Sequence, residues 1–76
     1  MDLDALLQQY RDAGIPVKTA DQLEPGDACK HPGYGVVVVI LVNTLPTGEI
    51  EVLHRLSTGR TEITTCEPKQ VFEVIE

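Results

Sequence analysis

The side chains that could bind a metal ion or act as a nucleophile are two cysteines and two histidines. Cys29 and His31 would share one face of a strand, whereas His54 and Cys66 lie far along the chain. None of the four belongs to a C-x₂-C or H-x₃-H pair, the spacing with which neighbours hold zinc. A Cys–His nucleophile would also need a base held in a water-excluding pocket. We therefore expect free thiols, with no metal, no cofactor and no catalysis.

A second group of candidates is a basic segment within an acidic chain. Residues 1–27 carry six acids and two bases, residues 28–60 two acids and three bases, and residues 61–76 four acids and one base. Lys30, Arg55 and Arg60 form this segment, and the two arginines flank one predicted turn. They either contact an acidic partner or form a solvated hairpin tip. A net charge of −6 argues against a general nucleic-acid coat, because phosphate neutralisation supplies that affinity.

Two further residues are candidates for protein contacts. Tyr34 lies between two glycines in a predicted loop, where a rigid ring either supplies contact area or folds back over the sheet. Leu53 interrupts the polar face of its predicted strand, so it either packs under the helix or faces a partner. The expected partner-binding residues are His31, Pro32, Tyr34, Leu53, Arg55 and Arg60.

These residues need a scaffold, and the first predicted element is an amphipathic helix over residues 2–14. Its apolar stripe recurs at i, i+3, i+4 and i+7, and consists of Leu3, Leu6, Leu7 and Tyr10. Asp2 is the expected N-cap, and Gly14 the residue after the C-cap. About three turns of helix are marginal alone, so the stripe should dock on another surface. Residues 15–26 are predicted to be a connector, with one possible helical turn starting at Thr19.

After residue 26 the pattern becomes that of β-strands. Strands are predicted at 27–31, 35–44, 49–56, 60–66 and 71–75, separated by turns rich in Gly and Pro. The turns are too short for parallel crossovers. The length of 76 residues allows one domain. We predict a mainly β, SH3-like (Tudor-like), five-stranded antiparallel small barrel over 27–76 with an N-terminal amphipathic helix.

The predicted strand over 35–44 is apolar on both faces between Val36 and Val42. An antiparallel strand usually leaves one face to water, so the second face needs a cover. The cover is either the helix stripe or a second copy of the chain. Leu3, Leu6, Leu7 and Tyr10 are therefore expected to form a helix-docking surface or a dimer seam, and a homo-oligomer stays open.

The start of the chain is acidic and lacks the basic and apolar regions of a signal peptide. The longest apolar run has seven residues, which is too short to span a membrane. We expect a cytoplasmic protein that does not enter a membrane.

One stretch resembles a known family. A Pro25-Gly-Asp27 turn is followed by His31-Pro, the loop Gly33-Tyr-Gly35 and a Val-rich strand. This order resembles the CarD-type RNA-polymerase-interaction domain, its counterpart in transcription-repair coupling factors, and the Tudor-like domain of UvrD-type helicases. The resemblance implies an SH3-like barrel and a bacterial source. It also implies a non-catalytic, transcription-associated protein-binding module, with RNA polymerase or another large complex as its protein partner.

Two alternatives stay open. The same basic segment could bind nucleic acid, although the stacking aromatics that grip single strands are few: Tyr10, Tyr34 and Phe72. The chain also resembles plasmid-type small dihydrofolate reductases, which are oligomeric barrels with an intersubunit site. Their Val-Gln-Ile-Tyr quartet corresponds here to Thr61-Glu62-Ile63-Thr64, without the glutamine and the tyrosine.

Overall fold

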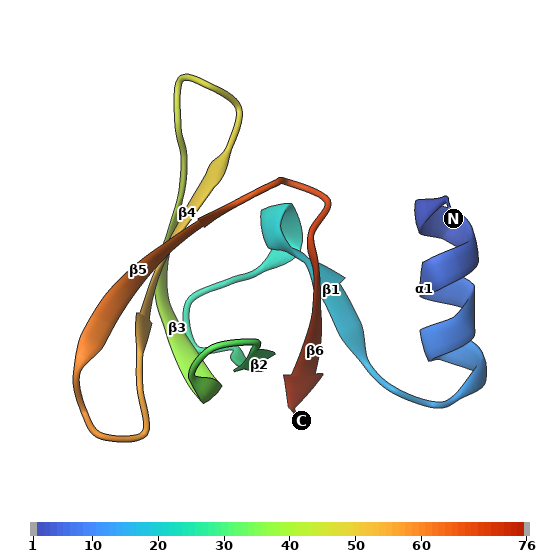
Figure 1. The fold of residues 1–76 in the computed structure, drawn as a ribbon, viewed down its shortest axis with the longest axis horizontal. Coiled ribbons are helices and arrows are strands. Elements are labelled where there is room, and N and C mark those ends of the chain that lie inside the picture. The colour runs from blue at the N-terminus through green and yellow to red at the C-terminus, as the bar shows by residue number, and fades with distance from the viewer. Residues whose placement is uncertain (1, 76) are drawn as a thin grey trace.

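The protein is seen in a computed structural model that describes residues 2–75 (Figure 1). In chain order its elements are α1 (Leu3–Asp12), β1 (Val17–Thr19), the 3₁₀ turn η1 (Ala20–Gln22), β2 (Ala28–His31), β3 (Gly35–Thr44), β4 (Ile50–Arg55), β5 (Thr61–Cys66) and β6 (Val71–Ile75). The six strands form one antiparallel sheet in the order β1-β6-β2-β3-β4-β5. The predicted mainly β fold with an N-terminal helix is confirmed.

The predicted number of strands, five, is wrong, because β1 lies inside the segment 15–26 that was expected to be a connector. β1 pairs with β6, with Val17 opposite Glu73 and Thr19 opposite Val71. Three residues carry no readable period, and the partner strand is far along the chain. The other predicted strands agree with the structure to within one residue at each end. The helical turn expected after Thr19 is confirmed as η1.

The sheet is curled but open, so the closed SH3-like barrel is not found. β1 and β5 are its two edges, and they do not pair among the described residues. η1 lies next to the β5–β6 connection instead: the Ala20 N–H donates to the Gln70 carbonyl at 2.8 Å, and the Asp21 N–H to the Pro68 carbonyl at 3.0 Å. The core lies on the concave side and contains Ala20, Leu23, Cys29, Val37, Val39, Ile50, Val52 and Phe72.

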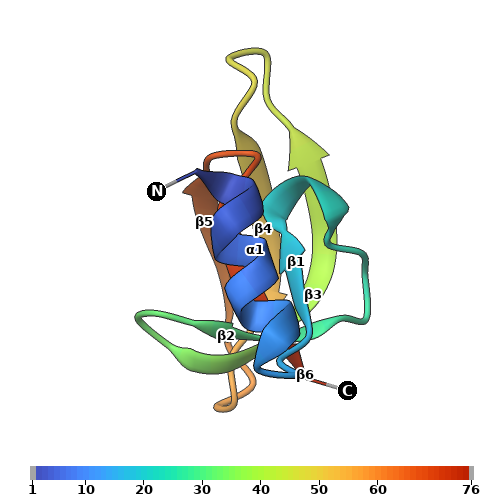
Figure 2. The ribbon, with the colours of Figure 1, turned by 90° about the vertical axis from the view of Figure 1, so that its right-hand side faces the viewer.

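Helix α1 forms as expected but does not cover β3. The Asp2 carboxylate accepts the Ala5 N–H at 2.8 Å, and Gly14 follows the helix with φ +74°. Figures 1 and 2 show the helix beside β1, to which the short link through Pro16 joins it. The stripe residues are half-buried there, and Val36, Val38 and Leu41 of β3 stay exposed. Neither α1 nor η1 is long and apolar enough to cross a membrane, judged over residues 2–75.

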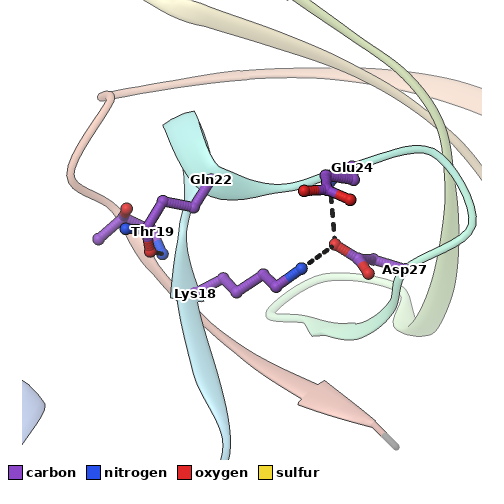
Figure 3. A network of polar contacts seen from close by, with 5 residues as sticks. All are labelled: Lys18, Thr19, Gln22, Glu24 and Asp27. Carbon is purple, nitrogen blue, oxygen red and sulfur yellow. Dashed lines mark hydrogen bonds and ion pairs between the residues drawn. The ribbon is translucent and has the colours of Figure 1, made fainter.

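The Gly-Asp turn singled out in the sequence fastens the chain between β1 and β3 (Figure 3). One oxygen of the Asp27 carboxylate accepts from the Lys18 ammonium and from the Glu24 N–H, both at 2.9 Å. Gly26 has φ +97°, a conformation that favours glycine, and its N–H donates to the Val39 carbonyl at 2.8 Å. The motif therefore has a clear structural role in this chain.

Candidate functional site

The structure divides the predicted binding residues between two places. His31 ends β2 on the face that carries buried Cys29, so it points to the concave side, where it meets Tyr34. Leu53 and Arg55 alternate with buried Val52 and His54 on β4, so they lie on the outer face. Pro32 is exposed in the β2–β3 turn. The single surface expected from the sequence is therefore two surfaces, one concave and one outer.

The concave place is a cluster of three rings. His31 lies 4.8 Å from Tyr34 and 5.2 Å from His54, and Tyr34 lies 5.8 Å from His54, measured between ring centroids. His54 is 1% exposed, whereas Tyr34 keeps 46% of its surface exposed. The tyrosine ring thus folds back over the histidines and still presents one side to solvent. His54 was missing from the predicted site.

A threonine hydroxyl on β5 joins the two histidines. Thr64 Oγ1 lies 2.9 Å from His31 Nε2 and 2.7 Å from His54 Nε2. β2 and β5 are not neighbours in the sheet, so this contact spans the concave side. On the other side of the His31 ring, Nδ1 accepts the Gly33 N–H at 2.9 Å. The cluster therefore ties the β2–β3 turn to the edge strand β5.

These contacts assign the protons of both neutral rings. His31 Nδ1 accepts a hydrogen bond, so its proton is on Nε2, which donates to Thr64 Oγ1. The Thr64 hydroxyl can then donate to His54 Nε2, which leaves the His54 proton on Nδ1. Nδ1 of His54 has no hydrogen-bond partner among the described residues. If both rings donated to Thr64 Oγ1, Nδ1 of His54 would still lack a partner, and the hydroxyl proton of Thr64 would lack one too. The directional chain, in which His31 donates to Thr64 and Thr64 donates to His54, therefore satisfies more groups.

We expect a long-range ¹H–¹⁵N NMR spectrum at neutral pH to show two different tautomers. His31 should carry its proton on Nε2 and His54 on Nδ1, because Thr64 can donate only one hydrogen bond. A Thr64→Val variant, which lacks the hydroxyl, removes the constraint on His54. Finding both wild-type rings protonated on Nε2 would contradict the directional chain.

The cluster favours uncharged histidines. Burial lowers the pKa of His31 below its ordinary value of 6.5. Burial, and then the nearby His31, lowers the pKa of His54 below the same value, while Glu62 opposes the shift. A proton added to His31 Nδ1 would also face the Gly33 N–H, so donor would meet donor. The arrangement is therefore built for neutral rings.

The free energy of unfolding should fall as the pH drops from about 7 to about 5. The unfolded histidines titrate near 6.5 and the folded ones below it, so acid adds more protons to the unfolded chain. Ion pairs with Lys69 and Lys18 lower the pKa of Asp21 and Asp27 below 3.8, so their contribution is lost at a lower pH. Urea unfolding at several pH values measures this, and equal stability at the two pH values would contradict it.

The outer place is a row of apolar side chains across three strands. Leu41 of β3 is opposite Leu53 of β4, which is opposite Ile63 of β5. Leu41 is 55% exposed and Ile63 59% exposed, while Leu53 between them is half-buried. The next row along the strands is Val38, Arg55 and Thr61. We call Leu41, Leu53 and Ile63 the outer row.

The predicted basic segment is divided between the two faces of the sheet, and two of its three cations are paired with carboxylates. Arg55 lies on the outer face, whereas Arg60 is opposite Leu56, whose side chain packs against the core. Arg60 Nη2 lies 2.9 Å from a Glu62 oxygen, and Lys30 Nζ lies 3.2 Å from a Glu73 oxygen. Arg55 is in no ion pair within residues 2–75. One free cation of the predicted group therefore remains on the outer face.

The cysteines and histidines of the described chain form no group that could hold a metal ion, and both thiols are shifted toward their neutral form. No three His, Cys, Asp or Glu side chains of the described chain lie together as metal ligands would. Burial raises the pKa of the Cys29 and Cys66 thiols, which lowers the fraction present as thiolate at neutral pH.

No protein-family model, no curated protein and no solved structure matches the chain.

Proposed function

We propose that this protein is a non-catalytic protein-binding module that contacts its partner through the outer face of β3, β4 and β5. The observation that carries the proposal is the outer row, in which two of the three side chains are more than half exposed. Contiguous exposed apolar surface on a small protein marks an interaction site more often than scattered apolar residues do. Val36 and Val38 extend the apolar surface along β3.

The surroundings of the outer row resemble those of known interfaces, which have an apolar centre and a polar rim. Asn43, Glu51 and Thr65 form the polar row on one side, and Arg55 lies in the row on the other side. Arginine is enriched in interfaces because its long side chain supplies both packing area and hydrogen-bond donors. The face thus suits a protein surface that combines an apolar centre with an acidic group opposite Arg55.

The first candidate partner comes from the resemblance of the Pro25–Val36 segment to polymerase-interaction domains. It is RNA polymerase or another large complex, in a transcription-associated role. Nucleic acid has less support, because Lys30 and Arg60 are paired with carboxylates and the Tyr34 ring packs on two histidines. Those are the groups that would have to contact phosphates and bases.

The test is binding of immobilised chain to purified core RNA polymerase, measured by biolayer interferometry. Leu41→Glu removes apolar area and adds a charge in the outer row, and we expect it to weaken binding at least tenfold, as for a central interface residue. Ile15→Glu is the matched control, since Ile15 is an exposed apolar residue between α1 and β1. It should bind like the wild type.

Three outcomes would count against the proposal. If the wild type does not bind polymerase, that partner is excluded. Equal weakening by Leu41→Glu and Ile15→Glu would place the contact elsewhere than the outer row. Steep loss of DNA or RNA binding with added salt, without binding to polymerase, would favour the nucleic-acid alternative.

A further inference from the structure

The two edges of the sheet differ in how they are protected. β1 is three residues long and carries Lys18, and a short edge with a lysine resists pairing with other strands. β5 is six residues long, Thr61–Cys66, and contains no proline, glycine or lysine. Its register with β4 is continuous, whereas β3 and β4 shift between Val39 and Leu41. β5 therefore lacks the proline, lysine and β-bulge that commonly prevent strand addition, and its one charged side chain, Glu62, is paired with Arg60.

The hydrogen-bond pattern shows which backbone groups of β5 are free. The Leu56 N–H donates to the Arg60 carbonyl at 2.7 Å, so residues 56 and 60 are a hydrogen-bonded pair. In an antiparallel pair, hydrogen-bonded and non-hydrogen-bonded positions alternate. With the observed register, Glu62 and Thr64 bond to β4, and the N–H and C=O groups of Thr61, Ile63 and Thr65 point to the open edge. No other described backbone group pairs with these six.

We propose that this edge pairs with β5 of a second copy of the chain, antiparallel and with Ile63 opposite Ile63. The dimer has a two-fold axis at Ile63 and joins the two sheets into one. Thr61 of each copy is then opposite Thr65 of the other, and Glu62 is opposite Thr64. This inference goes beyond the proposed function, because it names a contact that needs no other protein.

Three properties favour that register. All six free backbone groups of each strand find partners, and Thr–Thr and Ile–Ile cross-strand pairs are favourable. The outer row of one copy continues into that of the other through the two Ile63 side chains. A register shift of two residues that places Glu62 opposite Glu62 sets like charges against each other. The opposite shift, with Thr64 opposite Thr64, pairs Thr61 with Glu67, which lies beyond the strand.

Charge predicts how the dimer responds to salt. Each copy carries a net charge of −6, so association brings two acidic bodies together. Added salt screens this repulsion, and the dimer should tighten as the salt concentration rises. Binding to nucleic acid would weaken under the same conditions.

The experiment is sedimentation equilibrium of the full chain over a range of concentrations. We expect the wild type to shift between 8.3 kDa and twice that mass. Ile63→Lys removes the Ile–Ile pair and opposes two ammonium groups, so dimerisation should weaken at least about tenfold. Leu41→Lys places the same charge at the far end of the outer row and should dimerise like the wild type. Circular dichroism checks that both variants are folded.

A mixed sample of labelled and unlabelled chain tests the register without mutation. Glu62 and Thr64 would form a non-hydrogen-bonded pair across the interface, where Cα atoms lie about 4.5 Å apart. An intermolecular NOE between their Hα protons is the expected result. A wild type that stays at 8.3 kDa, or a Leu41→Lys variant that dissociates as far as Ile63→Lys, would overturn the dimer. Since Leu41→Glu tests partner binding and Ile63→Lys tests dimerisation, either proposal can fail alone.

Discussion

A Phe72→Ala variant is expected to lose about 3–5 kcal/mol of stability, the usual cost of removing a buried aromatic ring. Phe72 is buried on the concave side, and its strand β6 lies between β1 and β2. The ring lines the same small space as Leu23, Cys29 and His54, so its loss leaves a cavity among elements from most of the chain. A domain of this size has about 4–11 kcal/mol in total. The variant should therefore unfold at a much lower urea concentration than the wild type.

The control for Phe72 is Ile75→Ala on the same strand. Ile75 is exposed, and its truncation should cost well under about 1 kcal/mol. Urea unfolding followed by circular dichroism compares the two variants with the wild type. Equal losses would mean that the Phe72 ring does not contribute to the core as its burial indicates.

The second large effect is expected for Thr64→Val, which keeps the shape of the side chain and removes its hydroxyl. The buried Nε2 of His54 then has no partner, which costs about 1–3 kcal/mol of stability. Half-buried His31 also loses its hydrogen bond to β5. We expect a total loss of about 2–3 kcal/mol. The pH dependence of stability should also change, because both neutral rings lose a hydrogen-bond partner.

Two neighbouring substitutions separate the hydroxyl from other effects. Thr64→Ser keeps the hydroxyl and loses one methyl group, which should cost about 1 kcal/mol. Thr65→Val makes the same chemical change one residue on, where the side chain is exposed on the outer face, and should be nearly neutral. If Thr64→Val and Thr65→Val unfold at the same urea concentration, the histidine–threonine contacts contribute nothing measurable.

The elements with local signals were predictable. The N-cap at Asp2, the stripe of the helix and the turns around Gly48 and Gly59 placed α1 and five of the six strands to within one or two residues. β1 was missed because pairing with a distant strand, and not a pattern within three residues, makes Val17–Thr19 a strand. Barrel closure also depends on distant segments, and the 3₁₀ turn η1, not a strand, lies next to the β5–β6 connection.

The candidate site was less predictable than the strands, because the face on which a side chain lies depends on which residues pair across a turn. Arg55 and Arg60 flank one turn, but they lie on opposite faces because Arg60 pairs with Leu56 and not with Arg55. His54 did have a signal, since it continues the inward face that starts with Ile50 and Val52. Thr64 had none. Its meeting with His31, 33 residues away, depends on the curl of the whole sheet.

The position of β6 has a consequence for how the chain folds as it is made. β6 is the last strand in the chain, yet it lies between β1 and β2, which are synthesised first. Before β6 emerges from the ribosome, β1 has no neighbour and the core lacks Phe72. At about 5–20 residues per second, the N-terminal strands wait several seconds as unpaired edges. A chain that ends just before Val71 should thus be sensitive to protease, and one that includes Val71–Ile75 should be resistant.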